Sequence, residues 1–181
     1  MMPVLSCLFA ALISGGAYIA IPVPGSPVPV VLQNMFILLA GLLLGPVWGL
    51  GATSLYLLLG ALGLPVFSGG TGGIARLAGP TGGYLAGYLP AVVVVGLLSG
   101  MGRPRIWKNV LACTAGSLVV YLAGVTRLRG VLDTDWTKAL AVGFLPFVPG
   151  DILKIAMASL LAARLSGRLD SLSRGEGAGR G

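Results

Sequence analysis

The stretch LQNMFILLAGLLLGPVWGLGATSLYLLLGALGL, residues 32–64, decides the fold class, because it contains no charged residue. A transmembrane helix needs only about 20 consecutive, mostly apolar residues. Gly45-Pro46 divides the stretch, and glycine commonly ends a helix while proline commonly begins one. The stretch therefore predicts two membrane spans, at 32–45 and 47–64, that form a helical hairpin with its turn at one membrane face.

Apolar segments of similar length flank this hairpin. They predict further spans near residues 3–20, 82–99, 107–125 and 149–166. Over the whole chain 56% of the residues are hydrophobic and only 9% are charged, whereas soluble domains carry about 25% charged residues. The mean hydropathy is +0.95. We therefore expect an all-α integral membrane protein whose six transmembrane helices occupy residues 1–166, followed by a disordered basic tail at residues 167–181.

The composition excludes most kinds of catalytic and metal site. The first 132 residues contain no Asp or Glu, the chain has no His, and Cys7 and Cys113 each lie alone in an apolar stretch. Acid–base active sites and metal sites need clusters of these groups, and no G-x-x-x-x-G-K-[ST] nucleotide motif occurs. We therefore expect no enzyme activity, no cofactor and no metal site. A membrane-embedded enzyme would lack its catalytic groups.

The positions of Lys and Arg predict the orientation in the membrane. Three long connections, 21–31, 65–81 and 126–149, fall on the same side of the membrane when the spans are counted. The other side carries seven basic residues: Arg103, Arg105, Lys108, Arg164, Arg168, Arg174 and Arg180. The long connections carry four: Arg76, Arg127, Arg129 and Lys138. Because cytoplasmic segments carry an excess of Lys and Arg, we expect both termini in the cytoplasm. The net charge of +7 thus indicates a lipid bilayer as partner, and no nucleic acid.

Four polar side chains lie near the outward ends of their spans. Gln33 begins the span at 32–45, Arg76 lies in a glycine-rich connection, and Asp151 and Lys154 begin the last span. The spacing of Asp151 and Lys154 puts both on one helical face, and Asp151 occupies the expected N-cap position. Ionisable residues inside membrane spans usually face the bundle interior and serve a substrate or ion path. One amide, one carboxylate and two cations suit a small amphiphile with an anionic group and a polar head.

Each of these residues also has a simpler interpretation. Gln33 and Arg76 could face lipid headgroups, and Asp151 and Lys154 could form a self-paired couple with no ligand. The protein would then be a purely structural scaffold, and the location of all four residues near one membrane face would be a coincidence.

Five segments, taken in order, resemble the BioY family, the biotin-specific S components of energy-coupling factor (ECF) transporters. They are AYIAIPVPGSPVPVVLQ (17–33), LLAGLLLGPVWG (38–49), LYLLLGALGLPVFSGGTGG (55–73), GPTGGYLAGY (79–88) and LPFVPGDILK (145–154). The resemblance implies an S-component-like bundle of the bacterial inner membrane that binds biotin, its transported substrate, near the external face. It also implies docking onto a transmembrane coupling subunit with two ATPase subunits. An S component for a different vitamin is the alternative.

The resemblance also implies roles for individual residues. Asp151 and Lys154 match the P-G-D-x-x-K segment of the family and are implied to contact the ligand. The loop match adds Phe67, Gly70, Arg76, Thr81 and Tyr84. The family often reads T-L-Q-T where this chain has Val31-Leu32-Gln33-Asn34, so we expect no hydroxyl contact at residue 31. Asn34 could replace a polar contact, but it is one helical step from Gln33 and is not expected to point the same way.

The first span contains small residues at four-residue spacing. The pairs are Cys7/Ala11, Ala10/Ser14 and Ala11/Gly15, and such spacing permits close helix contact in lipid. The resemblance implies that S components dock on the coupling subunit through small residues of the first helix, here Ala10, Ala11, Ser14 and Gly15. Packing within the bundle would explain the same spacing.

Overall fold

The computed structural model describes residues 1–99 and 106–178, with side chains through residue 165. In chain order the elements are α1 (Met2–Tyr18), β1 (Ala20–Ile21), β2 (Val30–Val31), α2 (Gln33–Ala61), α3 (Ile74–Ala78), α4 (Gly82–Ser99), α5 (Ile106–Leu132), α6 (Trp136–Gly143) and α7 (Val148–Ala178). By length and composition α2, α4 and α5 are able to cross a membrane, and α6 with α7, bent by 50° at their junction, make a fourth candidate. Helix α1 is apolar but shorter.

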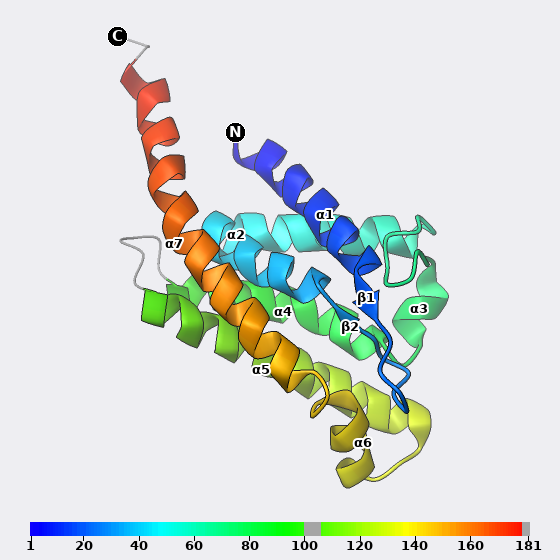
Figure 1. Cartoon of the computed structure of the whole chain (residues 1–181). Coiled ribbons are helices and arrows are strands. Elements are labelled where there is room, and N and C mark those ends of the chain that lie inside the picture. The colour runs from blue at the N-terminus through cyan, green and yellow to red at the C-terminus, as the bar shows by residue number, and fades with distance from the viewer. Residues whose placement is uncertain (100–105, 179–181) are drawn as a thin grey trace.

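Helix α2 turns back on itself at Gly45. The φ of Gly45 is 74°, a value that glycine adopts without a Cβ clash, and Pro46 then starts the second arm. Gln33 donates from Nε2 to Tyr56 Oη at 2.8 Å, although a straight helix would separate these residues by about 35 Å. The two arms therefore form the predicted hairpin, and Figure 1 shows them running in opposite directions. With α1, α4, α5 and α7 they make six long helical segments.

Helix α4 packs against both α2 and α5 in the middle of the bundle. In lipid the packing of helices depends on close van der Waals contact, which small residues permit. A Cβ on Gly96 of α4 would lie 2.4 Å from the backbone nitrogen of Pro46, so the absence of a side chain lets α4 reach the turn of α2. Large apolar side chains cover the outside of the bundle, among them Leu58, Leu97, Leu122 and Leu153. Such a surface fits a bilayer.

The three long connections lie at the same end of the bundle, as predicted (Figure 1). The first contains β1 and β2, which pair antiparallel with Ala20 opposite Val31. The second contains α3 and the third contains α6. The start of α1 and the C-terminal half of α7 lie at the opposite end. Helix α5 continues seven residues past its predicted end at residue 125, so Arg127 and Arg129 lie on a helix and not in the loop.

The boundary predicted after residue 166 and the disordered tail stay predictions. Helix α7 extends to Ala178, while the side chains of residues 166–178 and all of residues 179–181 lie outside the described part of the chain.

Candidate ligand-binding site

A cavity lies at the end of the bundle that carries the long connections. About 660 Å³ of space, part of it open to solvent, lies between its walls. Its walls come from the β1–β2 connection, α2, the 65–81 connection, α4, α5 and α7. The lining residues are Val28, Pro29, Val31, Gln33, Asn34, Phe67, Ser68, Arg76, Thr81, Tyr84, Leu85, Tyr88, Ser117, Val120, Tyr121, Phe147, Asp151 and Lys154.

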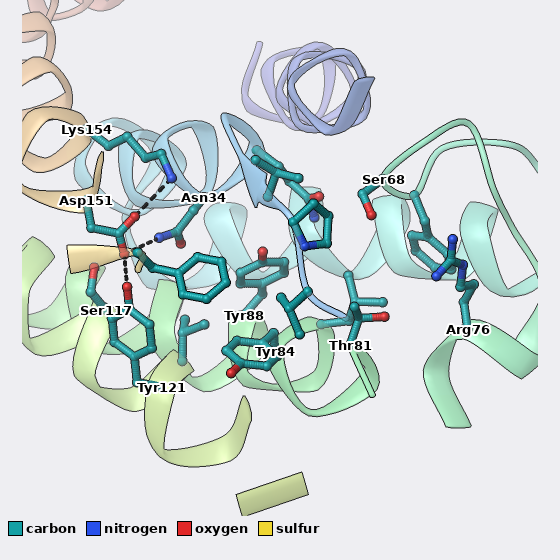
Figure 2. A pocket seen from close by; sticks show the side chains of 18 residues that line it. Asn34, Ser68, Arg76, Thr81, Tyr84, Tyr88, Ser117, Tyr121, Asp151 and Lys154 are labelled. Carbon is teal, nitrogen blue, oxygen red and sulfur yellow. Dashed lines mark hydrogen bonds and ion pairs between the residues drawn. The ribbon is translucent and has the colours of Figure 1, made fainter. Parts of the chain in front are cut away.

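Asp151 is the centre of a polar network at one end of the cavity (Figure 2). Its Oδ1 pairs with Lys154 Nζ at 2.9 Å. Its Oδ2 accepts a hydrogen bond from Tyr121 Oη at 2.5 Å and one from Asn34 Nδ2 at 3.4 Å. Asp151 and Lys154 are only 6% and 7% exposed, and a buried charge needs such partners to offset its desolvation. The carboxylate and the ammonium compensate one another, so this end of the cavity carries no net charge.

The N-cap position expected for Asp151 is wrong. Helix α7 begins at Val148, and the backbone N–H of Asp151 already donates to Phe147 O at 2.9 Å. Asp151 therefore lies in the first turn of the helix, still near the positive end of its dipole, with its side chain free to reach α5 and α2.

Arg76 lies at the other end of the cavity, beside Ser68 (Figure 2). Its Nε donates to Thr71 Oγ1 at 2.9 Å, and no carboxylate of the described residues forms an ion pair with it. Arg127 on α5 donates from Nη2 to Ala78 O at 2.5 Å, which ties α3, the helix that carries Arg76, to the bundle. The guanidinium thus supplies an uncompensated positive charge at this end.

Aromatic rings line the cavity, and Tyr84 and Tyr88 lie between its Asp151 end and its Arg76 end (Figure 2). Phe67 is 2% exposed and packs edge-on against Tyr56, with the ring centroids 5.6 Å apart. Tyr84 donates from its hydroxyl to Gly143 O at 2.7 Å and packs near Phe147. Tyr88 is also buried. An apolar section therefore separates the neutral ion-pair end from the cationic end.

Seven of the eight residues predicted to contact a ligand line this one cavity. They are Gln33, Phe67, Arg76, Thr81, Tyr84, Asp151 and Lys154. Gly70 does not line it. Gly70 has a φ of 68° and donates its N–H to Phe67 O at 3.1 Å, so it builds the turn that places Phe67. Within the described residues no group of three or more His, Cys, Asp or Glu could hold a metal ion.

Sequence reasoning missed several lining residues. Gln33 and Asn34 do diverge, as expected, since one amide reaches Tyr56 and the other reaches Asp151. Both nevertheless line the cavity. Ser117 and Tyr121 were detectable as polar residues four apart on one face of an apolar span. Ser68, Tyr88 and Phe147 gave no comparable signal.

The small residues of α1 divide between two faces. Ala10 is 2% exposed and packs in the core, so its prediction as part of an external docking surface is wrong. Ser14 is half-buried and donates to Ala10 O at 2.8 Å. Ala11 and Gly15 are exposed, and a Cβ on Gly15 would meet no atom within 4 Å.

Comparison with known proteins identifies the family. The sequence model of the BioY family matches residues 2–171. A probable biotin transporter BioY from Pyrococcus horikoshii is 44% identical over 163 residues, which are 90% of this chain and 94% of that protein. The biotin transporter BioY of Thermotoga maritima is 43% identical over 158 residues, 87% of this chain and 91% of that protein. A crystal structure of the S-component for biotin from an ECF-type ABC transporter matches with a TM-score of 0.86 and 30% identity, over 91% of this chain and 89% of that one. The chain belongs to the BioY family.

Proposed function

We propose that the protein is the biotin-binding S component of a vitamin uptake transporter and that the cavity is its biotin site. The observation that carries the proposal is the separation of charge along the cavity. The end at Asp151 and Lys154 is polar but neutral overall, whereas Arg76 at the other end has no acidic partner among the described residues.

Biotin has the matching distribution of groups. Its ureido ring is uncharged and bears two N–H donors and one carbonyl acceptor, and its valerate chain ends in a carboxylate. The ureido ring binds at the Asp151–Lys154 end, where both donors and acceptors are present. The carboxylate binds at Arg76, whose planar fork of N–H groups fits a carboxylate. The sulfur-containing ring and the aliphatic chain lie against the aromatic middle section.

Uptake against a gradient requires energy from partner subunits, because the sequence contains no nucleotide-binding motif. We propose a transmembrane coupling subunit with two ATPase subunits as these partners. The solved relative is described as the S-component of an ECF-type ABC transporter, which supports this assignment. The exposed small residues Ala11 and Gly15 of α1 form the docking surface, since they allow a second helix to approach closely in lipid.

The chain is a multi-pass membrane protein, and we propose that it resides in the cell membrane with both termini in the cytoplasm. The excess of Lys and Arg on the side opposite the long connections supports this orientation. The cavity then opens toward the outside, where the vitamin is captured. Biotin is bound as cargo, and we propose neither a catalytic step nor a cofactor.

Calorimetric titration of the detergent-purified protein tests the proposal, using biotin and biotinamide, in which a neutral amide replaces the carboxylate. Arg76→Gln should weaken biotin binding by about 10- to 150-fold, the range for a hydrogen bond to a charged group, and should affect biotinamide much less. Arg129→Gln is the matched control, because Arg129 packs over Trp136 outside the cavity. Binding of another vitamin but not biotin would favour the alternative, an S component with a different substrate.

A further inference from the structure

Two buried oxygen atoms in the cavity have no hydrogen-bond partner within the described part of the chain. They are Asn34 Oδ1 and Ser117 Oγ. Asn34 is 8% exposed and Ser117 is 5% exposed, and both residues line the cavity. A buried polar atom without a partner destabilises the fold, because it has lost its hydrogen bonds to water, so such atoms are rare in folded proteins and call for an explanation. A ligand that supplies hydrogen-bond donors at this position would remove this destabilisation.

The carboxylate of Asp151 already accepts hydrogen bonds from three protein donors. Lys154 Nζ, Tyr121 Oη and Asn34 Nδ2 all donate to it. Because a carboxylate only accepts hydrogen bonds, the contact to Asp151 fixes which way the Asn34 amide faces. The NH₂ group turns to Asp151, and Oδ1 is left as the free acceptor. Figure 2 shows Asn34 and Ser117 gathered with Tyr121 and Lys154 around Asp151.

We propose that Asn34 and Ser117 are specificity-determining residues that accept the two ureido N–H groups of biotin, while Lys154 donates to the ureido carbonyl. Asp151 is a positioning residue that holds the Asn34 amide and the Lys154 ammonium in place. This inference rests on the proposed function and assigns the donors and acceptors within the same site. Two unpartnered acceptors and one ammonium match the two donors and one acceptor of the ureido group.

Ser159 provides a control for the simpler interpretation, in which a buried hydroxyl only packs between helices. Its Oγ is also buried and without a partner among the described residues, and the residue is 0% exposed. Ser159 does not line the cavity. Ser159→Ala and Ser117→Ala thus each remove one buried hydroxyl group, and only Ser117→Ala removes a proposed ligand contact.

The experiment compares biotin with two cyclic-carbamate analogues, each of which replaces one ureido N–H by oxygen and so removes a donor without adding bulk. Ser117→Ala and Asn34→Ala should each weaken biotin binding by about 3- to 10-fold, the range for one neutral hydrogen bond. Ser159→Ala should leave binding unchanged. Each analogue lacks one N–H, so one of these two variants should bind it as tightly as the unmodified protein does. Ser117→Ala should show this for one analogue and Asn34→Ala for the other, because each residue contacts a different N–H.

Equal penalties for biotin and both analogues would overturn the inference, because they would show an indirect effect on the shape of the cavity. Unchanged affinity in both variants would overturn it as well. If Ser117→Ala proves unstable in detergent, Ser117→Cys keeps the volume with a weaker acceptor and should show the same dependence on the analogue. Failure of the unmodified protein to bind biotin would instead refute the proposed function itself.

Discussion

Gly60 controls the position of an aromatic wall of the cavity, and Gly60→Ala should damage the site without changing any residue that lines it. A Cβ on Gly60 would lie 2.1 Å from Cζ of Phe67 and 2.2 Å from Cε1. Carbon atoms pack at about 3.5–4.0 Å, so the ring has to move by more than about 1 Å. Tyr56 is fully buried and packs against the Phe67 ring, so the ring cannot move toward Tyr56. The ring therefore moves into the cavity that Phe67 lines.

The size of the effect follows from the cost of overpacking, which is about 1–3 kcal/mol. If biotin must push the ring back, its affinity falls by about 5- to 150-fold. Calorimetric titration measures this loss directly. Gly51→Ala is the control, because a Cβ on Gly51, in the same arm of α2, would meet nothing within 4 Å. The double variant Gly60→Ala/Phe67→Leu should recover part of the affinity, since leucine lacks the clashing ring atoms. Wild-type affinity for Gly60→Ala would refute the reasoning.

Three other predictions test the ion pair, the orientation and the docking surface. Asp151→Asn and Lys154→Ala should each weaken biotin binding by about 2–5 kcal/mol, or about 30- to several-thousand-fold, while the protein still inserts; titration showing unchanged affinity in both would contradict the site. In a Cys7→Ala background a cysteine at position 68 should react with a membrane-impermeant maleimide on intact cells, unless bound biotin shields it, and labelling at position 173 instead would invert the topology. Ala11→Trp should block co-purification with the coupling subunit but leave biotin affinity intact, whereas Ala10→Trp should unfold the protein because Ala10 is buried; normal assembly of Ala11→Trp would exclude this face of α1.

The parts of the fold that the sequence predicted are those that depend on local backbone chemistry. The hairpin of α2 follows from Gly45-Pro46, since the turn needs a positive φ and then a helix start. Asp151 and Lys154 could be assigned to the interior because a charge inside a span is too costly to face lipid. Both inferences need only a few neighbouring residues.

The remaining parts of the site depend on contacts between distant segments. Asn34 and Asp151 are 117 positions apart, and their contact depends on the packing of α2 against α7. The close fit of Phe67 against Gly60 likewise requires the turn at Gly70. No periodicity in the sequence predicts either contact, because each residue is compatible with its own helix or loop whether or not its distant partner lies beside it.

The error at Ala10 has a cause that is specific to membrane proteins. In a soluble helix the buried face is apolar and the exposed face is polar, so the pattern tells which is which. In a bilayer both the lipid and the core are apolar, and hydropathy no longer separates Ala10 from Ala11. Polar side chains in a span still indicate the face that points to the protein interior, because lipid offers them no hydrogen-bond partner. For this reason the sequence predicts polar residues that line the cavity more sharply than it predicts a docking face, even though the docking face belongs to a single helix and the cavity is assembled from several.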